Sequence, residues 1–173
     1  MKLERSSTRF HFREFKSSDM TNRYFEEMND KEFLKFSTQV ENIIDKNSTL
    51  EYWKNIINQH AYFLVAEDLI SKLKPANITI RTIPNKQIVN LCFRVARDFI
   101  GKGIGSVNFS DLINKLLLGF KYEEIHAGPR VENKSMNRLI LKNDFQFIEK
   151  ENLILFKSNK DLKFNYYKIE KNL

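Results

Sequence analysis

Three of the five glycines in the chain lie within five residues, at Gly101, Gly103 and Gly105. A β-rich segment precedes them and the clearest helical pattern of the sequence follows. Glycine is needed where φ is positive or where another group approaches the backbone closely. A strand, a glycine-rich turn and a helix together aim backbone N–H groups and the positive end of the helix dipole at one point. The sequence therefore predicts a phosphate site over residues 101–106, with Lys102 adding charge, and a tight turn without a ligand is the alternative.

The spacing of these glycines excludes two common nucleotide motifs. A P-loop needs two glycines five apart followed by Lys and Ser or Thr, and no lysine stands between Gly105 and Ser106. The dinucleotide fingerprint needs a glycine at the position of Ser106 and an alternating order of strands and helices, which this chain lacks. The phosphate must therefore belong to a different kind of ligand.

Hydrophobic periodicity predicts a mixed α/β chain. Apolar residues after the glycines repeat at helical spacing from Phe109 to Phe120. Short alternating runs predict strands, and polar residues before apolar runs predict helix starts, with Ser48 or Thr49 as one cap. The expected elements are a strand over 8–15, two short helices over 20–37, a helix over 47–60, strands over 61–69, 76–83 and 87–96, a strand over 122–130, a helix over 132–144, two strands over 145–157 turning near 150–152, and a last strand or arm over 162–169.

Composition limits the class of protein. A chain of 173 residues with 42% hydrophobic residues fits one domain, 1–173. The lone Cys92, which we expect in the core, excludes a disulfide framework, and three scattered histidines lack metal-ligand spacing, so we expect no metal. No apolar run approaches membrane-spanning length, and we expect a soluble, cytoplasmic protein. The formal charge of +7 suggests an anionic partner without choosing among nucleic acid, a membrane surface and a phosphate-bearing small molecule.

Two segments resemble motifs of the GCN5-related N-acetyltransferases. "VARDFIGKGIGS" is similar to the loop with which that family binds the pyrophosphate of acetyl-CoA, with Val95 at the valine that ends the strand. "NKSMNRLILKNDF" resembles a second signature, with Asn133 and Phe145 twelve residues apart and Met136 at the small-or-Met position. The strand expected over 122–130 lies between the two segments, as it does in the family.

This resemblance implies a fold and a cofactor site. The fold is α/β (α+β), with a mixed, mostly antiparallel central sheet, two splayed parallel strands and flanking helices. Backbone groups of Phe93 and Val95 would pair with the pantetheine of acetyl-CoA, which is the co-substrate, as a further strand would. Asn133 would hydrogen-bond the pantetheine arm or an ordered water, next to Met136. The pyrophosphate would be held by the loop of Gly101, Lys102, Gly103, Ile104, Gly105 and Ser106.

Some positions depart from the family pattern. Ile100 replaces a usual Gln or Arg, and Ile140 stands where many members carry the tyrosine that protonates the leaving thiolate. Asp144 replaces a glycine at a helix C-terminus, where Asp can also adopt the left-handed conformation. These residues leave binding of acetyl-CoA better supported than turnover.

The proton acceptor has three candidates. His126 lies on the second splayed strand and has a suitable intrinsic pKa, although a strand histidine can also be purely structural. Glu26 and Glu27 lie on the first helix, and of these Glu27 is the candidate that we carry forward with His126 as catalytic.

The acceptor is expected to be a primary amine. "YFEEMNDKEFLKFSTQ" resembles the opening shared by ribosomal-protein N-terminal acetyltransferases and by acetyltransferases of nucleotide-linked amino sugars. "IHAGPRVENKSM" and the tyrosine-rich end favour an amino sugar of surface-glycan biosynthesis. The alternatives are a peptide amine, an acetyl-CoA-binding module without turnover, and a nucleic-acid-binding protein. The resemblance leaves a homodimer open.

Overall fold

The computed structural model describes residues 9–37, 43–59, 61–120, 122–155 and 160–171, and it centres on one seven-stranded sheet. The strand order is β1-β2-β3-β4-β5-β7-β6, and every neighbouring pair is antiparallel except β4 and β5. The strands are β1 (Phe10–Glu14), β2 (Ala61–Asp68), β3 (Ala76–Thr82), β4 (Ile88–Val95), β5 (Glu124–Ala127), β6 (Gln146–Leu155) and β7 (Lys160–Glu170).

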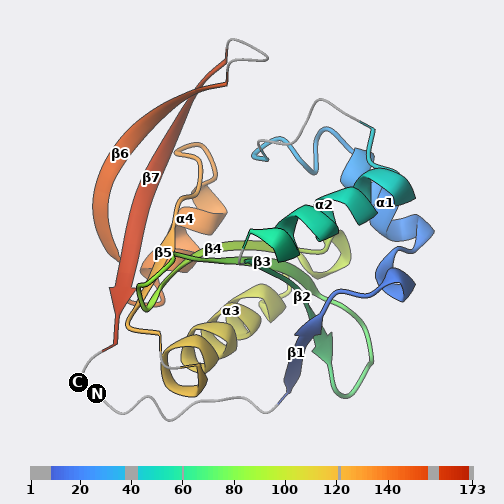
Figure 1. The fold of residues 1–173 in the computed structure, drawn as a ribbon, viewed down its shortest axis with the longest axis horizontal. Coiled ribbons are helices and arrows are strands. Elements are labelled where there is room, and N and C mark those ends of the chain that lie inside the picture. The colour runs from blue at the N-terminus through green and yellow to red at the C-terminus, as the bar shows by residue number, and fades with distance from the viewer. Residues whose placement is uncertain (1–8, 38–42, 60, 121, 156–159, 172–173) are drawn as a thin grey trace.

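Helices cover both faces of this sheet (Figure 1). The first two helices, α1 (Asn22–Asn29) and α2 (Lys46–Asn58), pack against β2 around a core that includes Phe15 and Phe63. The other two, α3 (Ile104–Asn114) and α4 (Lys134–Leu141), pack on the opposite face around Phe93 and Phe109. The expected mixed sheet with flanking helices and one parallel pair is confirmed.

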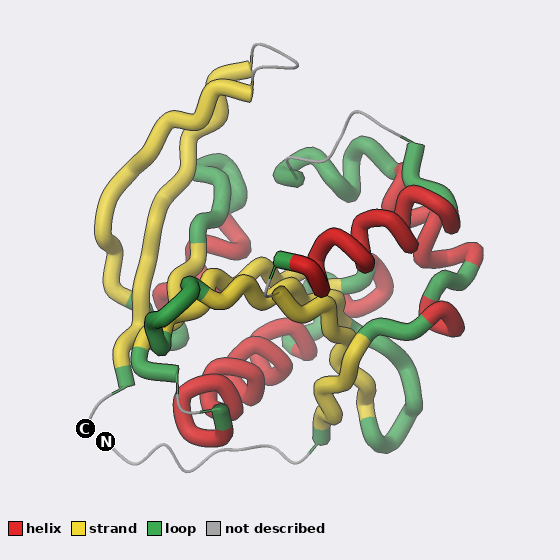
Figure 2. The backbone as a smooth tube through the Cα atoms, in the orientation of Figure 1, coloured by secondary structure: helices red, strands yellow, loops and turns green. Residues whose placement is uncertain are grey.

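The long β6–β7 hairpin stands away from the rest of the sheet (Figure 2). The prediction of two strands over 145–157 with a turn near 150–152 is wrong. Lys150 pairs with Asn165 and Asn152 pairs with Lys163, so the strand continues through the expected turn. The segment has no glycine or proline to end it, and polar side chains are acceptable on a strand whose outer edge faces solvent.

Two helix predictions are also corrected. The second short helix expected within 20–37 is a series of turns over residues 31–36. Asp30 Oδ1 accepts hydrogen bonds from the backbone N–H groups of Glu32 and Phe33 at 2.8 and 2.9 Å, which favours a turn over a helix. Helix α2 begins earlier than expected because Asp45, not Ser48, is its cap: Asp45 Oδ1 accepts from the N–H of Ser48, and Ser48 Oγ accepts from the N–H of Asp45, each at 2.8 Å.

The helix after the glycines ends in a wider turn than expected. The π-helical turn η3 (Lys115–Gly119) follows α3, and it shifts the register of the last apolar residues. Leu116 and Leu117 stay buried, whereas Phe120 is 70% exposed. Phe120 therefore leaves the apolar face on which the helical spacing placed it.

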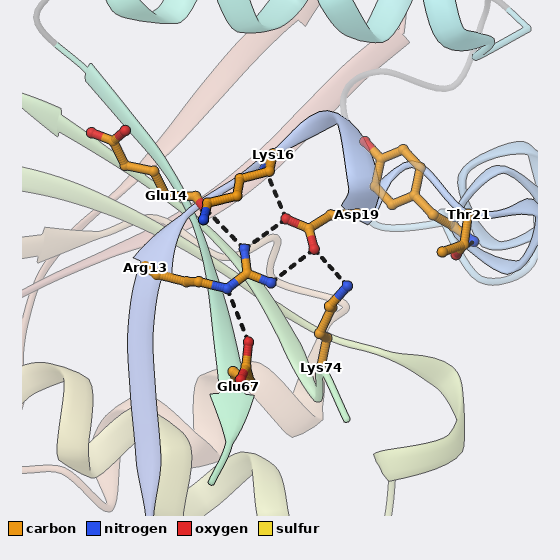
Figure 3. Close-up of polar contacts among 8 residues, drawn as sticks. Arg13, Glu14, Lys16, Asp19, Thr21, Glu67 and Lys74 are labelled. Atoms are coloured by element: carbon orange, nitrogen blue, oxygen red, sulfur yellow. Dashed lines mark hydrogen bonds and ion pairs between the residues drawn. The ribbon is translucent and has the colours of Figure 1, made fainter. Parts of the chain in front are cut away.

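A buried carboxylate holds the start of α1 to the sheet (Figure 3). Asp19 lies in the 3-10 turn η1 (Ser17–Asp19) and accepts two hydrogen bonds from the guanidinium of Arg13, at 2.8 and 2.9 Å. Lys74, from the β2–β3 connection, lies 2.5 Å away, and the N–H of Lys16 donates at 2.8 Å. Burial alone would raise the pKa of Asp19, but these donors outweigh it and hold the pKa well below its usual range.

Replacing Asp19 with alanine should therefore destabilise the fold strongly. The side chain is 1% exposed, and its loss leaves Arg13 without its main partner, which typically costs about 3–5 kcal/mol. Because the folded-state pKa lies below the unfolded value of about 4, this contribution is complete above about pH 4 and is lost as the pH falls further. Urea unfolding at pH 7 and pH 3 measures both effects. Glu67→Gln, at the more exposed partner of Arg13, is the control and should cost less than about 1 kcal/mol.

Candidate functional site

The parallel strands β4 and β5 separate along their length. Their register runs only from Ile88 opposite Glu124 to Asn90 opposite His126. Strand β5 ends at Ala127, whereas β4 continues to Val95 with pairing to β3 alone. The edge of β4 from residue 91 to 95 thus faces no described strand. Backbone groups on that edge can pair with an extended ligand, and both Phe93 and Val95 lie on it.

The glycine loop lies at the end of this open edge. Gly101 and Gly103 have φ values of +76° and +74°, which residues other than glycine rarely adopt. Gly103 is also the N-cap of α3. A Cβ built on either glycine would meet no atom within 4 Å, so the loop surface above them is open.

Backbone donors converge in this loop. Among the described hydrogen bonds, the N–H groups of Gly101, Gly103, Ile104 and Gly105 have no protein acceptor. The N–H groups of Lys102 and Ser106 bond to nearby carbonyls. Lys102 and Ser106 are exposed beside them. Free donors at the positive end of a helix fit the two negatively charged phosphates of a coenzyme A pyrophosphate.

Gly105 serves a different purpose from the other two glycines. An added Cβ would lie 2.8 Å from Cγ2 of Val95, so the glycine lets the first turn of α3 approach β4. Valine is stiff at χ1 and cannot easily move away.

Gly105→Ala should therefore destabilise the protein by about 1–3 kcal/mol through overpacking. The double variant Gly105→Ala/Val95→Ala should recover part of that loss, because the second change removes the clashing methyl group. Thermal unfolding of the two single variants and the double variant measures the coupling. A double variant that only adds the two losses would contradict this contact.

The second motif forms the start of α4. Asn133 is the N-cap, and its Oδ1 accepts hydrogen bonds from the N–H of Met136 at 3.2 Å and from Ser135 Oγ at 3.0 Å. Its Nδ2 donates to no described acceptor and remains available to a ligand. Met136 packs against the α3–α4 core.

Asn137, which the sequence analysis missed, fixes the approach to α4. Its Nδ2 donates to the carbonyls of Arg130 and Asn133 at 2.8 and 2.7 Å. Its Oδ1 accepts from the buried hydroxyl of Tyr167 and from Asn165 on β7. The Asn-rich composition around it gave no signal that this one asparagine would be buried.

One face of the sheet is partly uncovered next to the separated strands. We call this surface the floor, and it includes Asn90 and Cys92 on β4. Strand β4 is central, yet Asn90 and Cys92 are exposed on the face that carries α1 and α2. The prediction that Cys92 lies in the core is wrong, because Leu91 and Phe93 take the buried face of an alternating strand. An exposed face on a central strand is a place where a substrate can reach the sheet.

His126 lies on this floor, beside Asn90. Its Nε2 is 2.8 Å from Oε2 of Glu124, two residues earlier on the same face of β5. The hydrogen bond with His126 lowers the pKa of Glu124, so its carboxylate is ionised near neutral pH. An ionised carboxylate can only accept a hydrogen bond. The imidazole proton then lies on Nε2, and Nδ1 is left as a proton acceptor. Sequence reasoning named His126 but missed Glu124, whose i, i+2 spacing on a strand was the available signal.

Glu27 occupies a different environment. It is 9% exposed, and its Oε1 accepts a hydrogen bond at 3.0 Å from the N–H of Arg97, at the start of the turn η2 (Arg97–Phe99) before the glycine loop. Arg23 lies 3.5 Å from the same oxygen. This contact favours a structural role for Glu27, which ties α1 to the loop. Glu26 is exposed.

Other predicted positions have structural explanations. Ile140 is fully buried in the α3–α4 core. Asp144 adopts a φ of +63° after α4, as expected of a residue that replaces glycine there. Tyr52 and Trp53, on α2, pack against the core beneath α1 and α2.

Solved structures similar to this chain were found, although no family model and no curated protein matched the sequence. A spermidine N-acetyltransferase from Vibrio cholerae, with CoA and spermine, has a TM-score of 0.81 at 13% identity, covering 95% of this chain and 97% of that one. A ribosomal L7/L12 α-N-protein acetyltransferase with coenzyme A has a TM-score of 0.80 at 15% identity, covering 96% of each chain. An acetyltransferase of the GNAT family from Bacillus anthracis has a TM-score of 0.79 at 15% identity, with 94% and 95% covered. The chain has the fold of the GCN5-related N-acetyltransferases.

No helix within the described ranges is long and apolar enough to span a membrane. The same residues contain no group of three or more His, Cys, Asp and Glu placed to hold a metal ion.

Proposed function

We propose that the protein is an acetyl-CoA-dependent N-acetyltransferase that transfers an acetyl group directly to a primary amine. The observation that carries this proposal is the continuity of an unpaired strand edge on β4 with a loop of free N–H donors. An extended pantetheine amide chain fits the first and a pyrophosphate fits the second. Solved proteins of this fold hold acetyl-CoA or coenzyme A, including one acetyltransferase from Salmonella typhimurium.

The cofactor residues keep the roles that the resemblance implies. Phe93 and Val95 would offer backbone groups to the pantetheine, and Asn133 Nδ2 would donate to it next to Met136. The pyrophosphate would lie on the donors of Gly101, Gly103, Ile104 and Gly105, with the charge of Lys102 and the hydroxyl of Ser106 nearby.

The chain's own residues then promote acyl transfer at the floor of β4 and β5. Bound acetyl-CoA supplies an activated thioester, and a neutral amine must lose a proton as the new C–N bond forms. Nδ1 of His126 would accept that proton, with Glu124 holding the ring through Nε2 and stabilising its charged form. The site has no tyrosine at position 140, and coenzyme A is a thiol comparable to Cys, with a pKa of about 8.5, so it can leave without a protein acid.

For the acceptor, we propose the amine of a nucleotide-linked amino sugar. The segments 24–39 and 125–136 and the tyrosine-rich end of the chain support it through their resemblance to that branch. Two of the solved proteins of this fold are named for other amines, one for spermidine and one for ribosomal protein L7/L12. A basic chain suits a substrate with phosphate groups.

A thiol-release assay with acetyl-CoA tests the proposed activity. The panel contains a UDP-linked amino sugar, the same amino sugar without UDP, a peptide with a free N-terminus and spermidine. We expect release with the UDP-linked sugar above the rate without amine. Binding of acetyl-CoA with no release across the panel would instead identify a binding module, for which the absence of a tyrosine at position 140 is the specific argument.

A further inference from the structure

One arginine on the open floor has no acidic partner among the described residues, whereas most of the described arginines have one. Arg94 follows Cys92 by two residues on β4, so its side chain leaves the same face of the strand. It is partly buried, and no described carboxylate forms an ion pair with it. Ion pairs elsewhere join Arg9 to Asp68, Arg13 to Asp19, Arg23 to Asp98, Arg97 to Asp30 and Arg130 to Glu132.

Polar side chains from α1 and β3 lie next to Arg94. Burial raises the pKa of the Tyr24 hydroxyl on α1, and the positive charge of Arg94 opposes that rise, so Arg94 lies near Tyr24. Its cross-strand neighbour is Asn77. A partly buried guanidinium has lost part of its hydration, and Arg94 has no ion pair with a described carboxylate to replace it; an anionic ligand would supply a counter-charge.

A second unpaired arginine lies on the same floor. Arg81 on β3 is opposite Asn90, and it is exposed without an ion pair among the described residues. Along β4, Arg94 lies four residues beyond Asn90, which is about 13 Å at the usual rise per strand residue. The proposed proton acceptor, His126, is the partner of Asn90 on the other side. This floor therefore carries two arginines that form no ion pair within the described ranges.

We propose that Arg94 binds a phosphate group of the amine acceptor, with Arg81 adding a second positive charge on the same face. This inference rests on the proposed acetyltransferase function and narrows its substrate class to amines that bear phosphate. A guanidinium donates two parallel hydrogen bonds to a phosphate, which a lysine cannot do. Arg94 and Arg81 would repel a polycationic amine such as spermidine, with Glu124 on β5 as a negative charge at the same floor.

Titration of UDP into protein saturated with coenzyme A tests the proposal without turnover. Coenzyme A occupies the glycine loop, so UDP reports on the floor alone. We expect wild-type protein to bind UDP and Arg94→Leu to bind it about 10–100-fold more weakly, the range for losing a charged hydrogen-bond pair. Arg94→Lys should keep part of the affinity. Arg138→Leu, at an exposed arginine of α4 without a described ion pair, is the matched control and should bind UDP as wild type does.

Kinetics distinguish the acceptor from the cofactor. Arg94→Leu should raise KM for the UDP-linked amino sugar at least tenfold and leave KM for acetyl-CoA within about twofold. An equal rise in both KM values, UDP affinity unchanged by Arg94→Leu, no UDP binding by wild type, or a preference for spermidine would each overturn the proposal. Coenzyme A binding by wild type, measured first, separates these failures from failure of the acetyltransferase function itself. If Arg94→Leu does not fold, Arg94→Lys and the wild-type titration still decide the matter.

Discussion

Replacing Gly103 with glutamate is expected to abolish detectable binding of acetyl-CoA while the protein stays folded. Gly103 caps α3 with φ at +74°, so any other residue adds strain of about 1–2 kcal/mol. No atom lies within 4 Å of the added Cβ, so the side chain itself fits. It brings a carboxylate to the point where four N–H groups would meet a pyrophosphate, and like charges there repel. We expect at least a 100-fold loss of affinity by isothermal titration.

A neutral variant at the same position separates charge from strain. Gly103→Asn tolerates the left-handed conformation better than most residues and carries no charge. It should retain binding within about tenfold of wild type. Affinity of Gly103→Glu equal to that of Gly103→Asn would mean that the loop is only a turn.

Replacing His126 with alanine should lower kcat by about 100- to 10,000-fold, the usual contribution of a general base. KM for acetyl-CoA should change little, because His126 lies on the floor and not in the glycine loop. The loss of kcat should be smaller for Glu124→Gln than for His126→Ala, because Glu124→Gln keeps the imidazole and removes only the charge of its partner. Steady-state rates with the best acceptor measure each variant.

Two results would contradict this role. One is a kcat for His126→Ala within threefold of wild type, which would mean that water accepts the proton of the amine. The other is a matching loss in Cys92→Ser, the control on the same face of β4, which we expect to behave as wild type.

The sequence predicted the fold well because its patterns were local. Alternation identified strands β1 to β5, and helical spacing identified α3 and α4, since each depends only on which face of one element is buried. From the sequence, the three glycines of the loop were predicted to share one role, phosphate binding. The structure divides them, with Gly101 and Gly103 needed for positive φ and Gly105 for close packing against Val95.

What the sequence could not predict depended on contacts between distant segments. Glu27 reads as a free helix carboxylate, but it binds the N–H of Arg97, 70 residues away. Cys92 reads as a core residue among apolar neighbours, yet its face of β4 is left uncovered. Arg94 gains significance only because no described acidic side chain reaches it. Local pattern carries no information about such pairings.

Calorimetric titration of acetyl-CoA into the purified protein tests the central claim most directly. We expect saturable one-to-one binding by wild type, competed by coenzyme A and not by NAD. A folded protein that binds neither acetyl-CoA nor coenzyme A would contradict it.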